Sequence, residues 1–310
     1  MRTILRTVTA LSLCALFFGC QKDNDPPPQK PPVASAGNDQ AVQLPANSFA
    51  LSGSGTSTNG SIVGYLWSLI SGPNVPVITS PSSANTTVTG FVAGTYLFLF
   101  LVVDNAGLTG TDTVKVVLTP APLQTLTLQP TNNNEERHVL GNNSGYDQST
   151  HATELDGAAW TIGGQTIYVR GFFKFDLSSI PANATILTAK LSLYSNPTPL
   201  NGDLVHANSG PDNSMFIRRV TSYWDPQLTN WLNQPTVTTT NQVSIAHTAQ
   251  PYLDLIDVDV KALVMDMRNT ANYGFRISLQ NEAIFNIRDF CSSTYPDATK
   301  HPKLVVTYQP

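Results

Sequence analysis

The residues best suited to hold a polar ligand lie in one predicted strand near the middle of the chain. Residues 167–177 read IYVRGFFKFDL, and strand alternation places Tyr168, Arg170 and Lys174 on one side, opposite an apolar side that predicts a core face. An aromatic ring beside two cations suits a sugar, because pyranose C–H groups stack on rings and guanidinium groups pair with hydroxyls or carboxylates. The alternative is that both cations simply cover a half-buried face.

Further candidates for the same kind of site come from other segments. Arg218 and Arg288 lie in predicted strands and would add positive charge if they shared one sheet with Arg170. Trp160 stands in the polar stretch GAAWTIGG and is a candidate for an exposed stacking platform. Trp224 and Trp231, in YWDPQLTNW, are expected in a core or as loop anchors instead.

No pattern typical of a catalytic site is present. The sequence lacks HExxH, GxSxG, a phosphate-binding P-loop and GxGxxG. The histidines show no ligand spacing and are expected to be solvated loop residues; they are His138, His151, His206, His247 and His301. The sequence therefore predicts a protein that is not an enzyme. The lyase hypothesis would be reopened if His138 or His151 lay beside Tyr168 and Arg170 in a groove.

One loop could hold a structural metal ion. Residues 142–156 read NNSGYDQSTHATELD and offer the carboxylates of Asp147, Glu154 and Asp156. Calcium accepts six to eight hard oxygen ligands, so this loop is a candidate Ca²⁺ site. No other cofactor is expected.

The N-terminus is typical of a targeting segment. Residues 1–19 combine Arg2 and Arg6 with a short apolar run that stops at Cys20, which resembles a bacterial lipobox. The resemblance implies cleavage before Cys20 and lipidation of its sulfur. Residues 20–32 contain QKDND, which resembles an export signal to the outer face of the outer membrane, and PPPQKPP, which predicts a polyproline II tether.

The net charge and the cysteine content limit the binding partners and covalent links that we expect. The net charge is −4 with no basic tract, so nucleic acid is not expected as a partner. Of the three cysteines, Cys14 leaves with the signal and Cys20 is lipidated, which leaves Cys291 without an intramolecular partner. Cys291 is expected to be a buried thiol in a strand, and the chain to be monomeric.

Residues 33–119 predict a first all-β domain. Short alternating strands separated by Gly, Ser and Asn turns over about 85 residues are typical of an immunoglobulin-like β-sandwich. The strand at 94–104 (GTYLFLFLVVD) is apolar enough to be buried on both faces. The strings AGNDQAVQLPANSFALSGSGTS, GSIVGYLWSLISGP and VAGTYLFLFLVVDNAGLTGTDTVKV resemble a PKD-type domain. The resemblance implies a spacer or adhesion module in which Trp67 is the buried core tryptophan.

A hinge at 120–124 leads to a second all-β domain at 125–310. Its segments RGFFKFDLSSIPANATILTAKLSLY, RVTSYWDPQLTNWLNQP, IDVDVKALVMDM, NYGFRISL and HPKLVVTY resemble, in order, the DNRLRE family of secreted bacterial proteins. This resemblance implies a jelly-roll fold and carbohydrate binding, with acidic polysaccharides among the ligands. The chain departs from the family after Phe290, where Ser292-Ser293-Thr294 replaces a basic–acidic pair. Residues 259–268 show helical spacing, with Asp259 as the expected N-cap.

These observations predict a secreted, lipid-anchored surface protein that binds a glycan without catalysis and carries the first domain as a spacer. A structural or adhesion protein that binds another protein is the alternative, and a polysaccharide lyase or hydrolase is the least favoured. An open groove lined by aromatic and basic side chains would favour the glycan, and a flat apolar patch would favour a protein partner.

Overall fold

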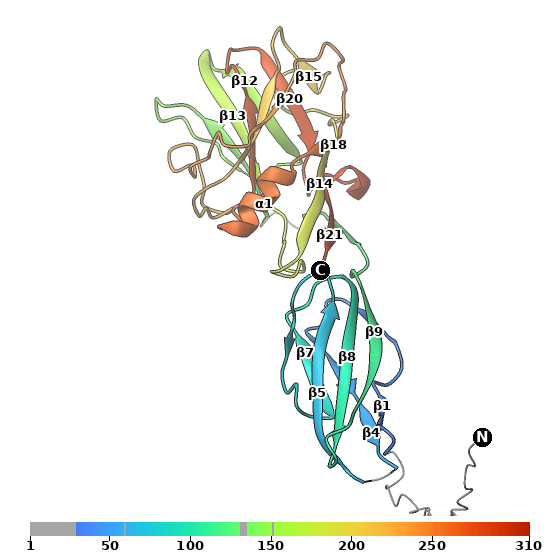
Figure 1. Ribbon diagram of the computed structural model, residues 1–310. Coiled ribbons are helices and arrows are strands. Elements are labelled where there is room, and N and C mark those ends of the chain that lie inside the picture. Colours follow the sequence, from blue (N-terminus) through green and yellow to red (C-terminus); the bar gives the residue numbers. More distant parts are fainter. Residues whose placement is uncertain (1–28, 59, 131–134, 151) are drawn as a thin grey trace, which may run out of the picture. The chain divides into compact units, whose positions relative to one another are not determined.

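The computed structural model describes residues 29–58, 60–130, 135–150 and 152–310. These residues form two compact units, one up to Thr119 and one from Pro120 to Pro310 (Figure 1). The predicted signal, Cys20 and most of the tether lie outside the described residues. In the part of the chain that is described, no helix has both the length and the apolar character needed to cross a membrane.

The first unit is a β-sandwich, as its alternating strands predicted. One sheet has four strands in the order β2, β9, β8, β5, and a three-stranded sheet has the order β3, β7, β6. A short pair, β1 with β4, completes it. The bounds are β1 Val33–Ser35, β2 Gln40–Gln43, β3 Ser48–Ser52, β4 Ser54–Thr56, β5 Ile62–Ser71, β6 Val77–Ile78, β7 Asn85–Thr89, β8 Gly94–Asp104 and β9 Thr109–Thr119.

The core of this unit is aromatic. Trp67 is 2% exposed, packs against Phe100 with the ring centroids 4.4 Å apart, and donates its indole N–H to the carbonyl of Ala84. Strand β8 buries only alternate residues, so the prediction that both of its faces are buried is wrong for the second face. That face is only partly covered, because the second sheet packs on the other side.

A buried aspartate holds the turn that follows β8. Asp104 is 2% exposed, and its Oδ1 accepts hydrogen bonds from the backbone N–H groups of Ala106 and Leu108 at 2.9 and 3.0 Å. We expect Asp104→Ala to lower the free energy of unfolding by about 1–3 kcal/mol, since two backbone donors lose a buried acceptor. Denaturant unfolding of the purified chain measures this. The exposed Asp39→Ala, whose carboxylate pairs with Lys115, should cost less; equal losses would contradict the role of burial.

The second unit is a larger sandwich. Its four-stranded sheet has the order β10, β21, β14, β18, and its eight-stranded sheet runs β15, β20, β12, β13, β19, β16, β17, with β11 paired to β13 off that path. The bounds are β10 Gln124–Leu128, β11 Glu136–Gly141, β12 Glu154–Ile162, β13 Gln165–Phe173, β14 Thr185–Leu193, β15 Asn208–Ser209, β16 Met215–Arg219, β17 Val243–Ile245, β18 Leu255–Asp259, β19 Phe275–Leu279, β20 Asn286–Cys291 and β21 Lys303–Gln309.

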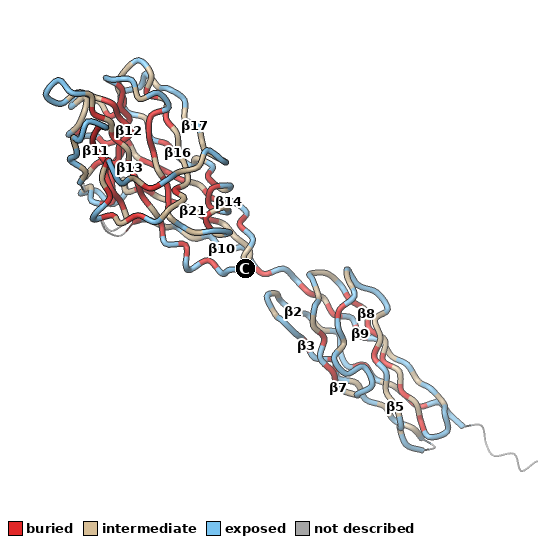
Figure 2. The backbone as a smooth tube through the Cα atoms, turned by 90° about the vertical axis from the view of Figure 1, so that its left-hand side faces the viewer, coloured by how far each residue is buried: buried red, intermediate tan, exposed pale blue. Residues whose placement is uncertain are grey.

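The main core lies between these two sheets, with buried segments in both layers (Figure 2). It joins Leu191 and Val306 of the smaller sheet to Phe173 and Ile277 of the larger one. Helix α1 (Lys261–Asn269) adds Leu263, Val264 and Met267. The helix lies where its spacing predicted, although its N-cap position is Val260.

The predicted environment of Cys291 is confirmed. The thiol lies at the end of β20 and is fully buried, and it is the free cysteine of the described chain. Burial raises its pKa to about 12. The thiol is therefore protonated and unreactive at neutral pH.

Candidate functional site: a groove on the eight-stranded sheet

Strand β13 positions the predicted ligand-binding row. Its alternation holds from Ile167 to Gly171, with Val169 buried and with Tyr168 and Arg170 half-buried on the other side. Antiparallel pairing sets Tyr168 opposite Ala159 and Arg170 opposite Gly157 of β12. The small neighbours leave room above the sheet for both long side chains.

Tyr168 and Arg170 line an open hollow of about 420 Å³. A loop of residues 231–234 and the segment after β19 supply the other walls. We call this hollow the groove, and it is lined by Asn143, Tyr168, Arg170, Trp231, Gln234, Asn281 and Glu282.

The guanidinium of Arg170 is held in place by three neighbours. Its Nε and Nη2 each donate to one oxygen of Glu282 at 2.8 Å, and its Nη1 donates to Gln234 Oε1 at 3.1 Å. The group also lies 4.5 Å above the ring of Trp231. A bidentate pair and a stacked ring fix both position and plane, so the guanidinium is preorganised for a ligand.

Trp231 lines the groove and supports the side chains of Tyr168 and Arg170. It is 6% exposed, stacks at 5.6 Å on Tyr168, and donates its indole N–H to Asn143 Oδ1 at 2.9 Å. Together with Phe172 and Trp224 it belongs to a small second core on this side of the sheet. The prediction that Trp231 lies in a core or anchors a loop is thus confirmed. The sequence did not show that this side chain also lines the groove.

Two further arginines lie beside the groove. Arg276 of β19 is opposite Phe172 on β13 and opposite Arg218 on β16, so its side chain shares the face of Arg170. Burial, and then the charges of Arg170 and Arg218, lower the pKa of Arg276 to about 10. Arg276 remains charged at neutral pH, and its buried Nε has no hydrogen-bond partner. Glu282 pairs directly with Arg170 and also interacts by charge with Arg218 and Arg276.

Four of the predicted binding residues do not line the groove. Arg218 lies beside it and donates from Nε to Gln242 Oε1 at 2.7 Å. Lys174 lies with its Nζ 5.5 Å from the ring of Trp224. Arg288 is fully buried on β20, where it donates to Asn208 Oδ1 and to the carbonyl of Ala246, so the expectation that it meets a ligand is wrong. Trp160 pairs with Ile167, on the face of β12 opposite Tyr168, and packs edge-on against Phe285.

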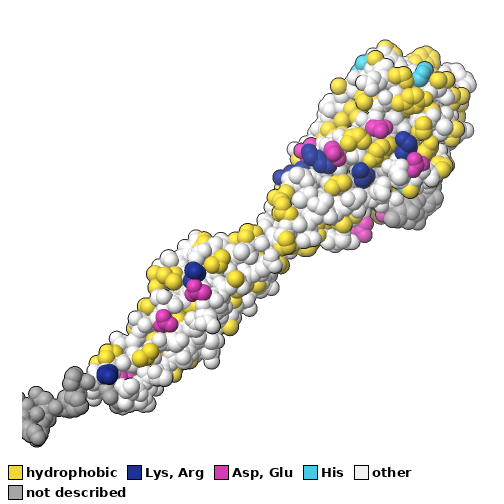
Figure 3. Space-filling model, turned by 90° about the vertical axis from the view of Figure 1, so that its right-hand side faces the viewer, with side chains coloured by type: hydrophobic (Ala, Val, Ile, Leu, Met, Phe, Trp, Pro, Cys, Tyr) yellow, Lys and Arg dark blue, Asp and Glu magenta, His cyan; other side chains and the backbone are white. Residues whose placement is uncertain are grey.

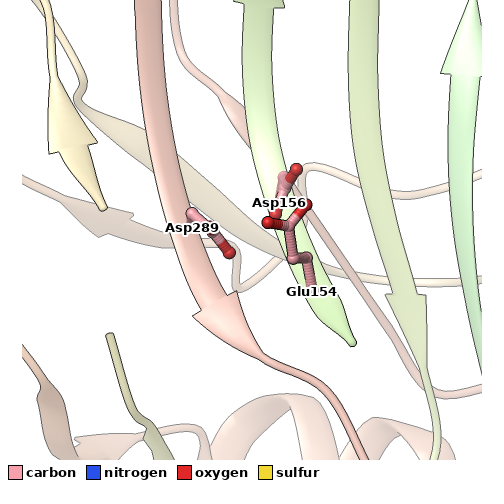
Figure 4. Close-up of side chains that lie close together, drawn as sticks. All are labelled: Glu154, Asp156 and Asp289. Carbon is pink, nitrogen blue, oxygen red and sulfur yellow. The ribbon is translucent and has the colours of Figure 1, made fainter. Parts of the chain in front are cut away.

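The predicted metal ligands separate in the structure. Asp147 is exposed and accepts hydrogen bonds from the backbone and hydroxyl of Ser149, away from the other two. Glu154 and Asp156 are buried on β12 and meet Asp289 of β20, with ligand atoms within 4.8 Å of one another. Figure 4 shows the three carboxylates pointing toward one another from the two strands. Asp289 was missed, because β20 lies far along the chain.

The environment of one histidine also differs from the prediction. His138 was expected in a solvated loop, but it is 3% exposed on β11, and its Nε2 lies 3.1 Å from Asp156 Oδ2. It does not line the groove, and His151 lies outside the described residues. The condition that would favour a lyase is therefore not met by His138.

Comparisons with known proteins follow the two units. Residues 36–118 match a family described as K319L-like, PKD domain, and residues 157–308 match carbohydrate-binding module family 96. The chain thus has a PKD domain followed by a carbohydrate-binding module, both non-catalytic types of domain. This confirms the expected all-β fold class and the expected order of the two modules.

Curated and structural relatives resemble parts of the chain. The Dyslexia-associated protein KIAA0319-like protein of Mus musculus is 37% identical over 93 residues, which is 30% of this chain and 9% of that protein. The PKD domain from KIAA 1837 protein is 36% identical and covers 28% of this chain and 84% of its own, with a TM-score of 0.26. Carbohydrate-binding modules of the β-sandwich superfamily align over 91% of this chain and 93% of theirs at 13% identity, with a TM-score of 0.22.

Proposed function

We propose that the groove binds carbohydrate and that the chain does not catalyse a reaction on it. The main support for this proposal is that the aromatic ring of Tyr168 lies beside the immobilised guanidinium of Arg170 in an open hollow. The unit that contains this hollow matches a carbohydrate-binding family. The ring can stack on a pyranose face, and the surrounding amides can exchange hydrogen bonds with hydroxyls. The groove lining contains one carboxylate, Glu282, which is bound to Arg170, and no histidine, which supports a non-catalytic role.

We further propose an acidic polysaccharide as the preferred ligand. Arg170, Arg218 and Arg276 bring three positive charges, against one negative charge from Glu282. The face drawn in Figure 3 carries few charged side chains, and several of its cations lie beside carboxylates. A local excess of guanidinium groups favours a polymer that carries carboxylate or sulfate groups.

We place the chain at the cell surface, as a monomeric lipoprotein facing the exterior of the outer membrane. The apolar run ending at Cys20 and the following QKDND support this proposal, and the PKD domain would act as a spacer between the anchor and the groove. Growth of the producing cells with an alkyne-tagged fatty acid tests the anchor. The chain should carry the tag, and a Cys20→Ala chain should not; a tag on both would contradict lipidation at Cys20.

A protein partner is the second candidate function. The loop before β15 exposes Leu200, Leu204 and Val205, each by more than 60% of its surface. Exposed apolar side chains of this kind are common at protein contacts. This role needs no groove, so variants of the groove would leave it unchanged.

Affinity electrophoresis of the purified chain in gels containing neutral, uronic-acid or sulfated polysaccharides tests the proposed function. Retardation by an acidic polymer that weakens as salt is added would support it. Retardation by neutral polymers alone would support sugar binding and contradict the acidic preference. Free migration of the folded chain in every gel would overturn the glycan proposal and favour a protein partner.

A further inference from the structure

The second unit buries several carboxyl groups close together, and His138 is the one cationic partner that the described residues offer them. Glu154, Asp156 and Asp289 are each at most 1% exposed, and Glu136 on the neighbouring β11 is 4% exposed. The imidazole of His138 is the ion-pair partner of Asp156, and among the described residues no lysine or arginine forms an ion pair with these carboxylates. Buried charges are tolerated when they are paired or bind a metal ion.

The cluster also leaves buried oxygens without partners. Asp156 Oδ1, Asp289 Oδ1 and Glu136 Oε1 have no hydrogen-bond partner. A small space of about 10 Å³, the size of one water molecule, is lined by Glu136, His138 and Glu154, but not by Asp156 or Asp289. An unpartnered Glu136 oxygen at this space is a separate observation from the three converging carboxylates, and both features suit a bound cation.

We propose that Glu154, Asp156 and Asp289 bind one Ca²⁺ ion. Oxygens bound to one Ca²⁺ at about 2.4 Å lie at most about 4.8 Å apart, and the ligand atoms of these residues meet that limit. Carboxylate oxygens are hard ligands, which favours Ca²⁺ over softer transition metals. Ca²⁺ accepts carboxylates in mono- or bidentate form and in flexible geometry, whereas Mg²⁺ demands a near-ideal octahedron and keeps several waters, so Mg²⁺ is the poorer fit to this buried cluster.

The surrounding side chains orient these ligands. Asn196 donates from Nδ2 to Glu154 Oε1 at 3.3 Å and to Asp289 Oδ2 at 3.1 Å. The backbone N–H of Leu200 and the amide of Asn201 also donate to Glu154. His138 holds Asp156 Oδ2, which leaves Oδ1 to the ion, and is thus a positioning residue.

The ion would therefore join three parts of the fold. Glu154 and Asp156 lie on β12, Asp289 lies on β20, and residues 196–201 form the loop that reaches Glu154. Without an ion, burial and the adjacent carboxylates raise the pKa of Asp289 well above its usual range, so the cluster would hold protons instead. A proton-sharing cluster is the competing explanation, and it predicts no response to calcium.

The test begins with removal of any resident ion. The purified chain is unfolded in guanidinium chloride with a chelator and refolded in calcium-free buffer. It then receives 1 mM calcium, 1 mM magnesium or neither. A concentration of 1 mM is about 100 times an expected dissociation constant near 10 μM. Equilibrium dialysis against calcium should find one calcium bound per chain. The thermal transition of residues 120–310 should rise by about 5–10 °C with calcium and by less with magnesium.

Two variants separate the proposal from its alternatives. Asp289→Asn should lose both the bound calcium and the thermal shift, whereas Asp147→Asn, which changes an exposed aspartate outside the cluster, should keep both. If Asp289→Asn fails to fold, the calcium content and thermal shift of the unmodified chain still distinguish a calcium site from a proton-sharing cluster. An unmodified chain that binds no calcium and melts identically with calcium or chelator would overturn the proposal, as would equal losses in the two variants.

Discussion

Replacing Arg170 with alanine is expected to lower the affinity for an acidic polysaccharide by about 10- to 100-fold. The guanidinium lies in the groove, already oriented by Glu282, Gln234 and Trp231, so a ligand gains its hydrogen bonds without ordering a flexible side chain. A hydrogen bond between charged groups contributes about 1.5–3 kcal/mol, which corresponds to this loss. Removal of Arg170 also removes the direct ion-pair partner of Glu282, so more of that negative charge would act on the ligand.

Lys174→Ala is the matched control for this prediction. Both cations lie on the same side of the segment 167–177, and the sequence alone does not distinguish them. The structure places Lys174 over Trp224 and outside the groove lining, so its loss should change affinity by less than about threefold. Titration calorimetry of both variants, each checked for an unchanged melting temperature, measures the difference. Weaker binding only in Lys174→Ala would contradict the assigned groove.

Trp67→Ala is expected to lower the free energy of unfolding of the first unit by about 3–5 kcal/mol while leaving polysaccharide affinity unchanged. The loss follows from the cavity that replaces a nearly inaccessible indole, together with its contact to Phe100 and its hydrogen bond to Ala84. Affinity should persist, because all groove residues belong to the second unit.

Calorimetric melting and polysaccharide titration of the same Trp67→Ala sample test this pair of effects. Val75→Ala, at a position that is 83% exposed, should change neither quantity. If Trp67→Ala lowered affinity as strongly as Arg170→Ala, the first unit would contribute to binding, and its proposed role as a spacer would be contradicted.

The parts of the fold that depend on local patterns were predictable. Alternation in residues 167–173 gave the strand and its core face, and the spacing in residues 259–268 gave the helix. The turn-rich strings that resemble a PKD domain gave the first sandwich. Each of these signals is contained in a short stretch of sequence.

The parts of the site that depend on distant pairing were not predictable. Glu282 and Arg276 meet Arg170 only because β19 pairs with β13, and the sequence gives no register for that pairing. Arg288 alternates like an exposed residue, but residues of a distant loop, including Ala246, cover it. Likewise Asp289, rather than the nearby Asp147, completes the carboxylate cluster. In each case the deciding contact joins residues far apart in the chain.

The most direct test of the groove as the sugar site is a crystal structure of the chain with an oligosaccharide from the polymer that retards it. We predict the sugar in the groove, with a ring over Tyr168 and an oxygen within 3.2 Å of the guanidinium of Arg170. A sugar bound elsewhere on the second unit, for example against the exposed Phe285 beside Trp160, with the groove empty, would contradict this assignment.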